Sequence, residues 1–128
     1  MLSASLRDLA RRAGYAVSDS TITIAFKNGR KQLVHIDESD AEVARLWSVI
    51  LPPKKTETHT EGDPLAYAWK RNRFSDLVGF TVDNQERLIG ETWMPLSELT
   101  LDELKVYVQE LARVCDLHEV RLIGADEY

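Results

Sequence analysis

Alternating apolar and polar positions predict two β-strands near the start of the chain, over residues 21–26 and 31–37. A period of two places the apolar side chains on one face of each strand, which is the pattern of a half-buried sheet. Asn28 and Gly29 lie between the two segments, and this dipeptide favours the positive φ angles of a type I′ turn. The pattern therefore predicts an antiparallel hairpin.

The next segment, Glu42–Pro53, has apolar side chains on both faces if it is a strand. Its β-branched and aromatic residues and the two closing prolines favour a strand, while a helix remains an alternative for Ala41–Leu46. A third strand also completes a meander, which is more stable than a lone hairpin. One face can pack on the chain's own helices, so the apolar side chains of the other face need something else to bury them. Val43, Trp47, Val49 and Leu51 share one face, and Ala44, Leu46 and Ile50 share the other.

Helical spacing of apolar residues predicts three helices. The first covers residues 5–15, with Ser5 and Asp8 at capping-box spacing and Gly14 as the stop. The second follows a polar loop at residues 54–63, begins at Asp63-Pro64 and turns Leu65, Ala68 and Trp69 inward. The third begins at a Thr100–Glu103 capping box and stops at Gly124. Its apolar stripe is Leu104, Tyr107, Val108, Leu111, Val114, Cys115, His118 and Leu122.

Two further strands are expected between the second and third helices, over residues 76–83 and 87–95. In the later strand, Leu88 and Met94 face opposite to Ile89 and Trp93. The predicted order is α-β-β-β-α-β-β-α. Because both parts of the sheet can form from hairpins, the sequence predicts an α+β fold in which an antiparallel sheet packs against helices, as a single domain over residues 1–128.

Composition narrows the functional classes. The net charge of −5 and the pI near 5.2 disfavour general binding to nucleic acids or anionic membranes. A single cysteine excludes an internal disulfide and a cysteine-rich zinc site. The chain has neither a signal-peptide pattern nor an apolar run near the ~20 residues of a membrane span, so a soluble, cytoplasmic protein is expected.

The residues with chemical potential do not form a catalytic signature, so no enzyme activity, metal or cofactor is expected. Cys115 and His118 are neighbours at helical spacing, but an apolar stripe is the usual place for an inert buried thiol. His59, Glu61 and Asp63 share one polar loop, where Asp63 is better explained as a helix cap.

A basic stretch offers a weak nucleic-acid alternative. Trp69, Lys70, Arg71 and Arg73 combine an aromatic ring with positive charge, which suits a single strand. A basic end on a helix of an acidic protein is the commoner explanation, since cations stabilise helix C-termini. Direct nucleic-acid binding is therefore disfavoured, while docking on a nucleic-acid-binding protein stays open.

The second half of the chain resembles the YbjN-like family, whose fold is similar to that of type III secretion chaperones. The matching features are a helix ending near Asn72, the strands LVGFTVD and LIGETWMPLSEL, and a long last helix with a Cys115-Asp116 step. The chain departs from the family pattern at residues 84–86, where a glycine is common, and in its polar loop at 54–62. The resemblance implies a non-enzymatic, often dimeric domain that binds other proteins.

Surplus apolar residues supply the candidate interface. Too many apolar side chains lie on the strand at 43–51 for a solvated outer face, and Trp93 lies opposite Leu88 and Met94. Large apolar patches and exposed tryptophans mark protein interfaces. We therefore expect a chaperone-like or adaptor domain that binds itself as a homodimer and an unidentified protein. The candidate interface residues are Trp47, Val49, Leu51, Trp93 and Met94.

Overall fold

The computed structural model describes residues 2–60, 63–72 and 77–123, and gives the backbone alone for residues 57–59 and 123. Within these residues the chain forms one antiparallel sheet packed against helices, which confirms the predicted α+β class and the order of the predicted elements. The strands are β1 (Ala16–Ser18), β2 (Thr21–Ala25), β3 (Lys31–Asp37), β4 (Val43–Leu51), β5 (Gly79–Val82) and β6 (Leu88–Pro95). Their order across the sheet is β1-β2-β3-β4-β6-β5.

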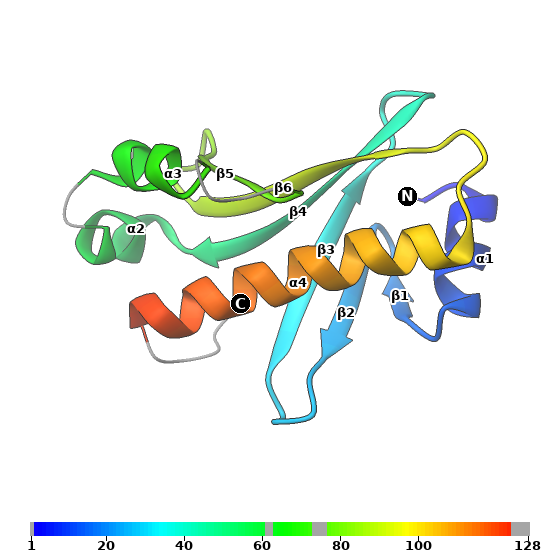
Figure 1. The fold of residues 1–128 in the computed structure, drawn as a ribbon, viewed down its shortest axis with the longest axis horizontal. Coiled ribbons are helices and arrows are strands. Elements are labelled where there is room, and N and C mark those ends of the chain that lie inside the picture. The colour runs from blue at the N-terminus through cyan, green and yellow to red at the C-terminus, as the bar shows by residue number, and fades with distance from the viewer. Residues whose placement is uncertain (1, 61–62, 73–76, 124–128) are drawn as a thin grey trace.

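The helices cover one face and both ends of this sheet. They are α1 (Ala4–Arg12), α2 (Pro53–His59), α3 (Pro64–Asn72) and α4 (Leu101–Ile123). In Figure 1, α4 crosses one face of the sheet, α1 lies at one end, and α2 and α3 lie at the other. We call the face under α4 the inner face and the opposite one the outer face. None of the described helices combines the length and the apolar character needed to cross a bilayer.

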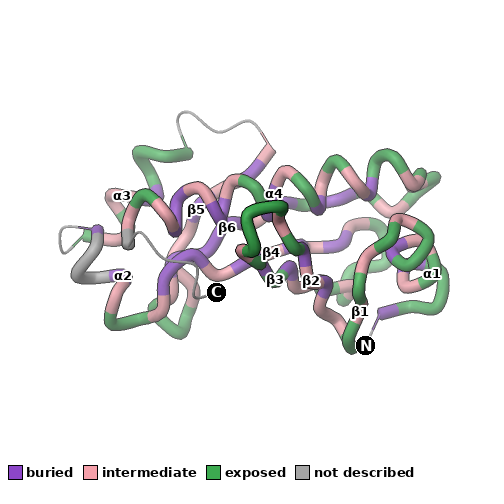
Figure 2. The backbone as a smooth tube through the Cα atoms, turned by 90° about the horizontal axis from the view of Figure 1, so that it is seen from below, coloured by how far each residue is buried: buried purple, intermediate pink, exposed green. Residues whose placement is uncertain are grey.

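Strand β4 confirms the strand interpretation of residues 43–51 and lies in the middle of the sheet. Leu46 and Ile50 point inward and are fully buried. They belong to the same core cluster as Leu104, Val108 and Leu111 of α4. Figure 2 shows how burial concentrates along the central strands and one side of α4. The core therefore lies between the inner face and α4, and it extends to α1 through Leu6 and Ala10.

Leu51 does not lie on the outer face, as strict alternation predicts. The pairing of β4 with β6 shifts register between Val49 and Leu51, and Leu51 is fully buried opposite Leu88. A bulge adds one residue to one strand, which turns the following side chain to the other face. Leu51 is thus a core residue, and its prediction as an exposed interface residue is wrong.

The segment predicted as a polar loop contains helix α2. Pro53 is its first residue, where proline's fixed φ suits a helix start. Thr56 ties the helix to the sheet, because its Oγ1 donates to a backbone oxygen of Leu51 or Pro52 at 2.9 and 2.7 Å. The Oγ1 of Thr56 also accepts a hydrogen bond from the backbone nitrogen of Leu88 at 3.0 Å. The two local bonds and the long-range bond to Leu88 fix a helix whose polar sequence gives no apolar stripe.

The helix caps agree in part with the predictions. Thr100 and Glu103 form the capping box of α4, and Asp63 caps α3 through the backbone nitrogen of Ala66. The cap of α1 is Ser3, which accepts from Leu6, so the predicted Ser5 cap is wrong. Gly124, the predicted stop of α4, lies outside the described residues.

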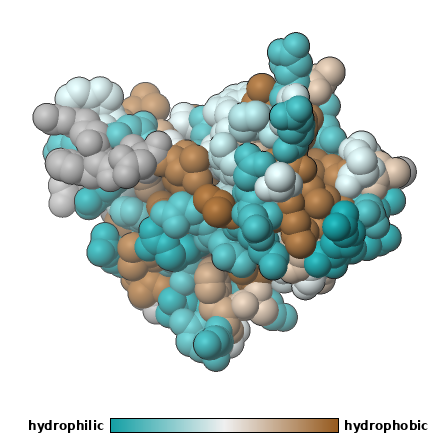
Figure 3. All heavy atoms as spheres, turned by 45° about the vertical axis from the view of Figure 1, so that its right-hand side comes forward, coloured by the Kyte–Doolittle hydropathy of each residue, from teal (hydrophilic) through white to brown (hydrophobic). Residues whose placement is uncertain are grey.

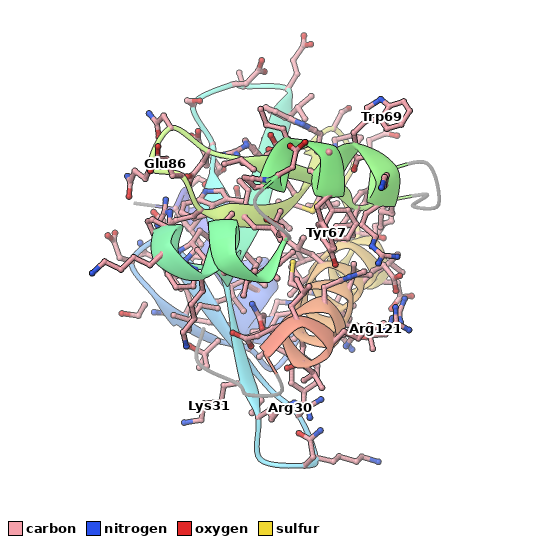
Figure 4. The ribbon with its side chains drawn as sticks, turned by 90° about the vertical axis from the view of Figure 1, so that its left-hand side faces the viewer. Arg30, Lys31, Tyr67, Trp69, Glu86 and Arg121 are labelled. Carbon is pink, nitrogen blue, oxygen red and sulfur yellow. The ribbon has the colours of Figure 1, made fainter. Side chains whose placement is uncertain are left out.

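Helix α3 turns a different face inward from the one predicted. Ala68 is buried as expected, but Leu65 and Trp69 are 67% and 63% exposed. Tyr67 points from α3 toward α4, whereas Trp69 points away from it (Figure 4). The inward face is set by the bond between the Tyr67 hydroxyl and the His118 ring at 3.2 Å, a contact that helical spacing does not reveal.

The β2–β3 and β5–β6 hairpins use the same turn, which differs from the type I′ turn predicted at Asn28-Gly29. In the β2–β3 hairpin, Gly29 donates to the oxygen of Phe26 and has φ +89°. In the β5–β6 hairpin, Glu86 donates to the oxygen of Asp83 and has φ +62°. This is the pattern of a type I turn followed by one left-handed residue. Glycine takes that conformation without strain, and glutamate does not.

Replacing Glu86 with glycine is expected to raise the free energy of unfolding by about 1 kcal/mol, because the left-handed strain disappears. Urea-induced unfolding measures the change. The matched control is Gly29→Ala, which meets no atom within 4 Å and should lose stability through the backbone alone. Equal effects of the same sign would contradict this interpretation of the two turns.

Candidate functional site

The outer face carries an aromatic cluster centred on Trp47. His35 lies opposite Trp47 in the ladder, and their ring centroids are 4.3 Å apart. The guanidinium groups of Arg45 and Arg87 lie 5.8 and 5.1 Å from the centre of the Trp47 ring. Cations over an indole ring are attracted by its electron-rich face. Trp47 is therefore partly covered by its neighbours on the sheet rather than by a helix.

Trp93 extends this cluster toward solvent. It pairs with Arg45, one diagonal step from Trp47, and is 56% exposed. Arg45 is held in place by a 2.7 Å ion pair with Glu91. Leu33, on the same face of β3, is 39% exposed. The outer face thus presents two exposed apolar side chains around a half-buried tryptophan.

Met94, predicted beside Trp93 as an interface residue, points to the opposite face. It pairs with Ala44 and is fully buried in the core cluster. Consecutive residues of a strand point to opposite faces, so a single strand cannot present both side chains to one partner. The structure therefore removes Met94 and Leu51 from the exposed candidates, while Trp47, Val49 and Trp93 remain as predictions.

The outer face shows features that the sequence analysis missed. Leu33 lies on the outer face of β3 with His35, and its exposure makes it part of this surface although the sequence did not single it out. The contacts of Arg45 and Arg87 with Trp47 require the strand register, because these residues lie on β4 and before β6. The alternation of β3 was the available signal for Leu33.

The weak nucleic-acid candidates lie at the C-terminal end of α3. Trp69 and Lys70 are exposed, and Arg71 lies over the Tyr67 ring at 5.0 Å. Arg73 lies outside the described residues. In Figure 4, Trp69 points away from α4 and Tyr67 points toward it. Trp69 thus points away from α4, while the guanidinium of Arg71 lies over the ring of Tyr67, so the two groups do not face the same surface.

Cys115 is not an activated nucleophile. Its side chain is fully buried, and its Sγ donates to the backbone oxygen of Ser48 at 3.9 Å. Burial, with a smaller contribution from the negative charge of Glu119, raises the pKa of the thiol to about 12. Only the thiolate is a competent nucleophile, so the group is inert at neutral pH.

His118 has separate neighbours from those of Cys115. Its ring lies edge-on to Phe80 at 4.8 Å, and its Nδ1 lies 3.2 Å from the Tyr67 hydroxyl. Burial lowers the pKa of His118 to about 4, and the positive charges of Arg71 and Arg121 act in the same direction. A neutral imidazole here joins α3 and β5 to α4 and has a structural role.

Acidification from pH 7 to pH 5 is expected to lower the free energy of unfolding by about 1–2 kcal/mol through His118. The unfolded chain takes up a proton below the usual pKa of 6.5, while folded His118 does so only near 4. The contribution of neutral His118 to the free energy of unfolding is therefore fully present above about pH 6.5, and it is lost as the pH falls toward 4. Urea unfolding at both pH values measures it. His118→Gln should flatten the profile; an unchanged slope would contradict the assignment.

No metal centre is formed by the described residues: they contain no group of three His, Cys, Asp or Glu side chains suited to an ion. Asp63, one of the three loop candidates, caps α3. Glu61 lies outside the described residues, and the side chain of His59 does as well.

Comparisons with solved structures show the fold that this geometry belongs to. A chain of the ExsC–ExsE complex superimposes with a TM-score of 0.61 at 13% identity, covering 94% of this chain and 96% of that one. A chain of the Yersinia pestis complex between the type III secretion chaperone SycH and a fragment of YscM2 gives 0.55 at 10% identity, covering 88% and 94%. The HopA1–SchA chaperone–effector complex gives 0.56 at 15% identity, covering 88% of both chains.

The chain matches no protein-family model and no curated protein. The structural similarities extend over most of the chain at low identity, so they establish a chaperone-like fold. The more specific resemblance to the YbjN-like family rests on the sequence pattern.

Proposed function

We propose that the chain is a non-enzymatic, chaperone-like domain that binds proteins and acts as a homodimer. The observation that carries the proposal is the outer face, where Trp93 and Leu33 stay exposed while the inner face is covered by α4. Exposed tryptophan is favoured as an anchor of protein interfaces. Structures with this fold include chaperones in complex with protein partners, which supports the same kind of role here. The proposal treats residues 1–128 as one YbjN-like domain.

The charges on the outer face favour a protein partner over a phosphate-rich one. Arg45 is paired with Glu91 at 2.7 Å, and Arg87 with Asp83 at 2.8 Å. Nucleic-acid binding relies on cations that neutralise phosphates, and here both arginines already face carboxylates of the chain. The surface around Trp93 is therefore close to neutral and partly apolar.

The same surface is suited to a second copy of itself. A two-fold interface places each residue patch against an identical patch, so it must be self-complementary. Positive and negative groups are interleaved around Trp47, which allows the Arg45 of one copy to approach a carboxylate of the other. A homodimer formed on this face would bury Trp93 and Leu33 from both copies.

Light scattering during size-exclusion chromatography tests the dimer. We expect a mass near twice the 14.6 kDa of one chain at micromolar concentration. A single-chain mass throughout this range would contradict the homodimer.

A photo-crosslinking amino acid at position 93 tests protein binding in the native cell. It should give covalent adducts with a second copy or with another protein. The same group at exposed Asp102, on the solvent side of α4, is the control. Adducts at neither position, or equally at both, would contradict the role of the outer face.

A further inference from the structure

A second surface, distinct from the outer face, lies between α4 and the α3–β5 region. It is a hollow of about 630 Å³, which we call the α4 groove. Helix α4 contributes a stripe of lining residues in which Val106, Glu110, Arg113, Leu117 and Arg121 recur every three or four residues. At a rise of about 1.5 Å per residue this stripe is about 22 Å long, the length of a four-turn helix. The groove is long enough for a helical segment.

The floor of the groove is apolar and partly open. Val106 is 58% exposed, and Leu77, Val114 and Leu117 are only partly buried. Large apolar side chains left accessible along a groove are typical of sites for the apolar face of an amphipathic helix. On the face of the molecule seen in Figure 3, hydrophobic residues also form patches between hydrophilic ones.

The rim of the groove is basic, although the chain as a whole has a net charge of −5. Arg71 from α3 and Arg113 and Arg121 from α4 line it, and all three are exposed. The only acidic lining residue among those described is Glu110, which is paired with Arg113 at 2.5 Å. The lining therefore carries an excess of two positive charges, and Arg71 and Arg121 both lower the pKa of His118 at its base.

This combination favours an acidic protein segment over a nucleic acid. Single strands bind by stacking bases on exposed aromatic rings. The aromatic lining residues of the groove, Phe80 and His118, are 4% and 8% exposed, so they offer little ring surface to a base. An apolar floor with arginines along its edges complements instead a helix that has one apolar face and flanking carboxylates.

We propose that the α4 groove is the docking site for an acidic, amphipathic helical segment of a partner protein. The proposal deepens the proposed protein-binding function and rests on it. Val106 and Leu117 receive the apolar face of the segment, and Arg71 and Arg121 bind its carboxylates. The outer face remains available for a second copy, so that self-association and partner binding use different surfaces.

The test uses a fluorescein-labelled 16-residue peptide with leucine on one helical face and glutamate beside it, and a counterpart with lysine at each glutamate position. Fluorescence anisotropy should give a Kd below about 100 µM for the acidic peptide and binding at least about tenfold weaker for the basic one. Added salt should weaken the binding of the acidic peptide, because salt screens exposed charges. Arg121→Glu should weaken the binding of the acidic peptide at least about fivefold, and Val106→Asp should do the same.

The matched control is Arg11→Glu, an identical change of charge at an exposed position on α1 that does not line the groove. It should change the Kd less than about twofold, and thermal unfolding confirms that each variant is folded. Absence of binding up to about 1 mM, equal binding of the two peptides, or equal effects of Arg11→Glu and Arg121→Glu would overturn the proposal.

Two further outcomes separate this proposal from the proposed function. If Trp93→Ala abolishes peptide binding and Arg121→Glu does not, the peptide lies on the outer face and the groove proposal fails alone. If Arg121→Glu halves the mass measured by light scattering, the groove is a contact between copies, and the proposal fails while the homodimer stands.

Discussion

Replacing Gly90 with alanine is expected to lower the free energy of unfolding by about 3 kcal/mol, since overpacking a well-filled core costs roughly 1–3 kcal/mol. Gly90 lies in the middle of β6, directly under α4. An added Cβ would lie 2.4 Å from the Sγ of Cys115 and 3.3 Å from a methyl group of Val78. Both neighbours are buried, so neither can swing into solvent. Urea unfolding measures the loss.

Two variants isolate the cause of this loss. Cys115→Ala removes the sulfur atom, so the double variant Gly90→Ala/Cys115→Ala should be less destabilised than the sum of the two single changes. Gly79→Ala is the matched control, because its Cβ would meet its nearest atoms at 3.8 and 3.9 Å, which are ordinary contacts. Strict additivity in the double variant, or an equal loss in Gly79→Ala, would contradict the proposed clash.

Replacing the neighbouring residues Trp93 and Met94 with alanine is expected to affect different properties of the protein. Met94→Ala should lose about 3 kcal/mol of stability, because it empties a fully buried site of the core. Trp93 is 56% exposed, so its truncation should cost the isolated chain less than about 1 kcal/mol. Thermal unfolding of the two variants separates a core residue from a surface residue.

Protein concentration distinguishes the two effects further. Association stabilises the folded state by mass action, so loss of a dimer contact shows a dependence on concentration that loss of core packing does not. Trp93→Ala should therefore halve the mass seen by light scattering at micromolar concentration, while Met94→Ala should keep the dimer. A dimeric Trp93→Ala protein, or a monomeric but folded Met94→Ala protein, would contradict the assignment of the two faces.

Local sequence patterns predicted those features of the sheet and helices that depend only on residues close together in the sequence. Alternation in β2 and β3, the closing prolines of β4 and the capping box at Thr100 required only neighbouring residues, and each was confirmed. Helix α2 was missed because its sequence has no apolar stripe, and because Thr56 anchors it to the backbone of Leu88, which is distant in sequence. Its first residue, Pro53, fits the end of a strand and equally the start of a helix, where proline is common.

Alternation indicated the face of the sheet on which Trp47 and Trp93 lie, but not the positions of two other candidate interface residues. One bulge moved Leu51 into the core, and the pleat of β6 removed Met94. The α4 groove was not foreseen, because its floor and rim come from segments that meet only after α3 and β5 pack against α4.

The sequence by itself determined the α+β order, the strand character of residues 43–51 and the absence of a recognisable catalytic signature, because these depend on periodicity and on residue type. The tertiary structure alone decided which apolar residues stay exposed. Burial depends on what packs against each face, and α4 covers one face of the sheet only. Alternation places Trp93 and Leu33 on one face of their strands, but local spacing does not show whether that face is covered. Their exposure, like that of Leu65 and Trp69, depends on the arrangement of elements far apart in sequence.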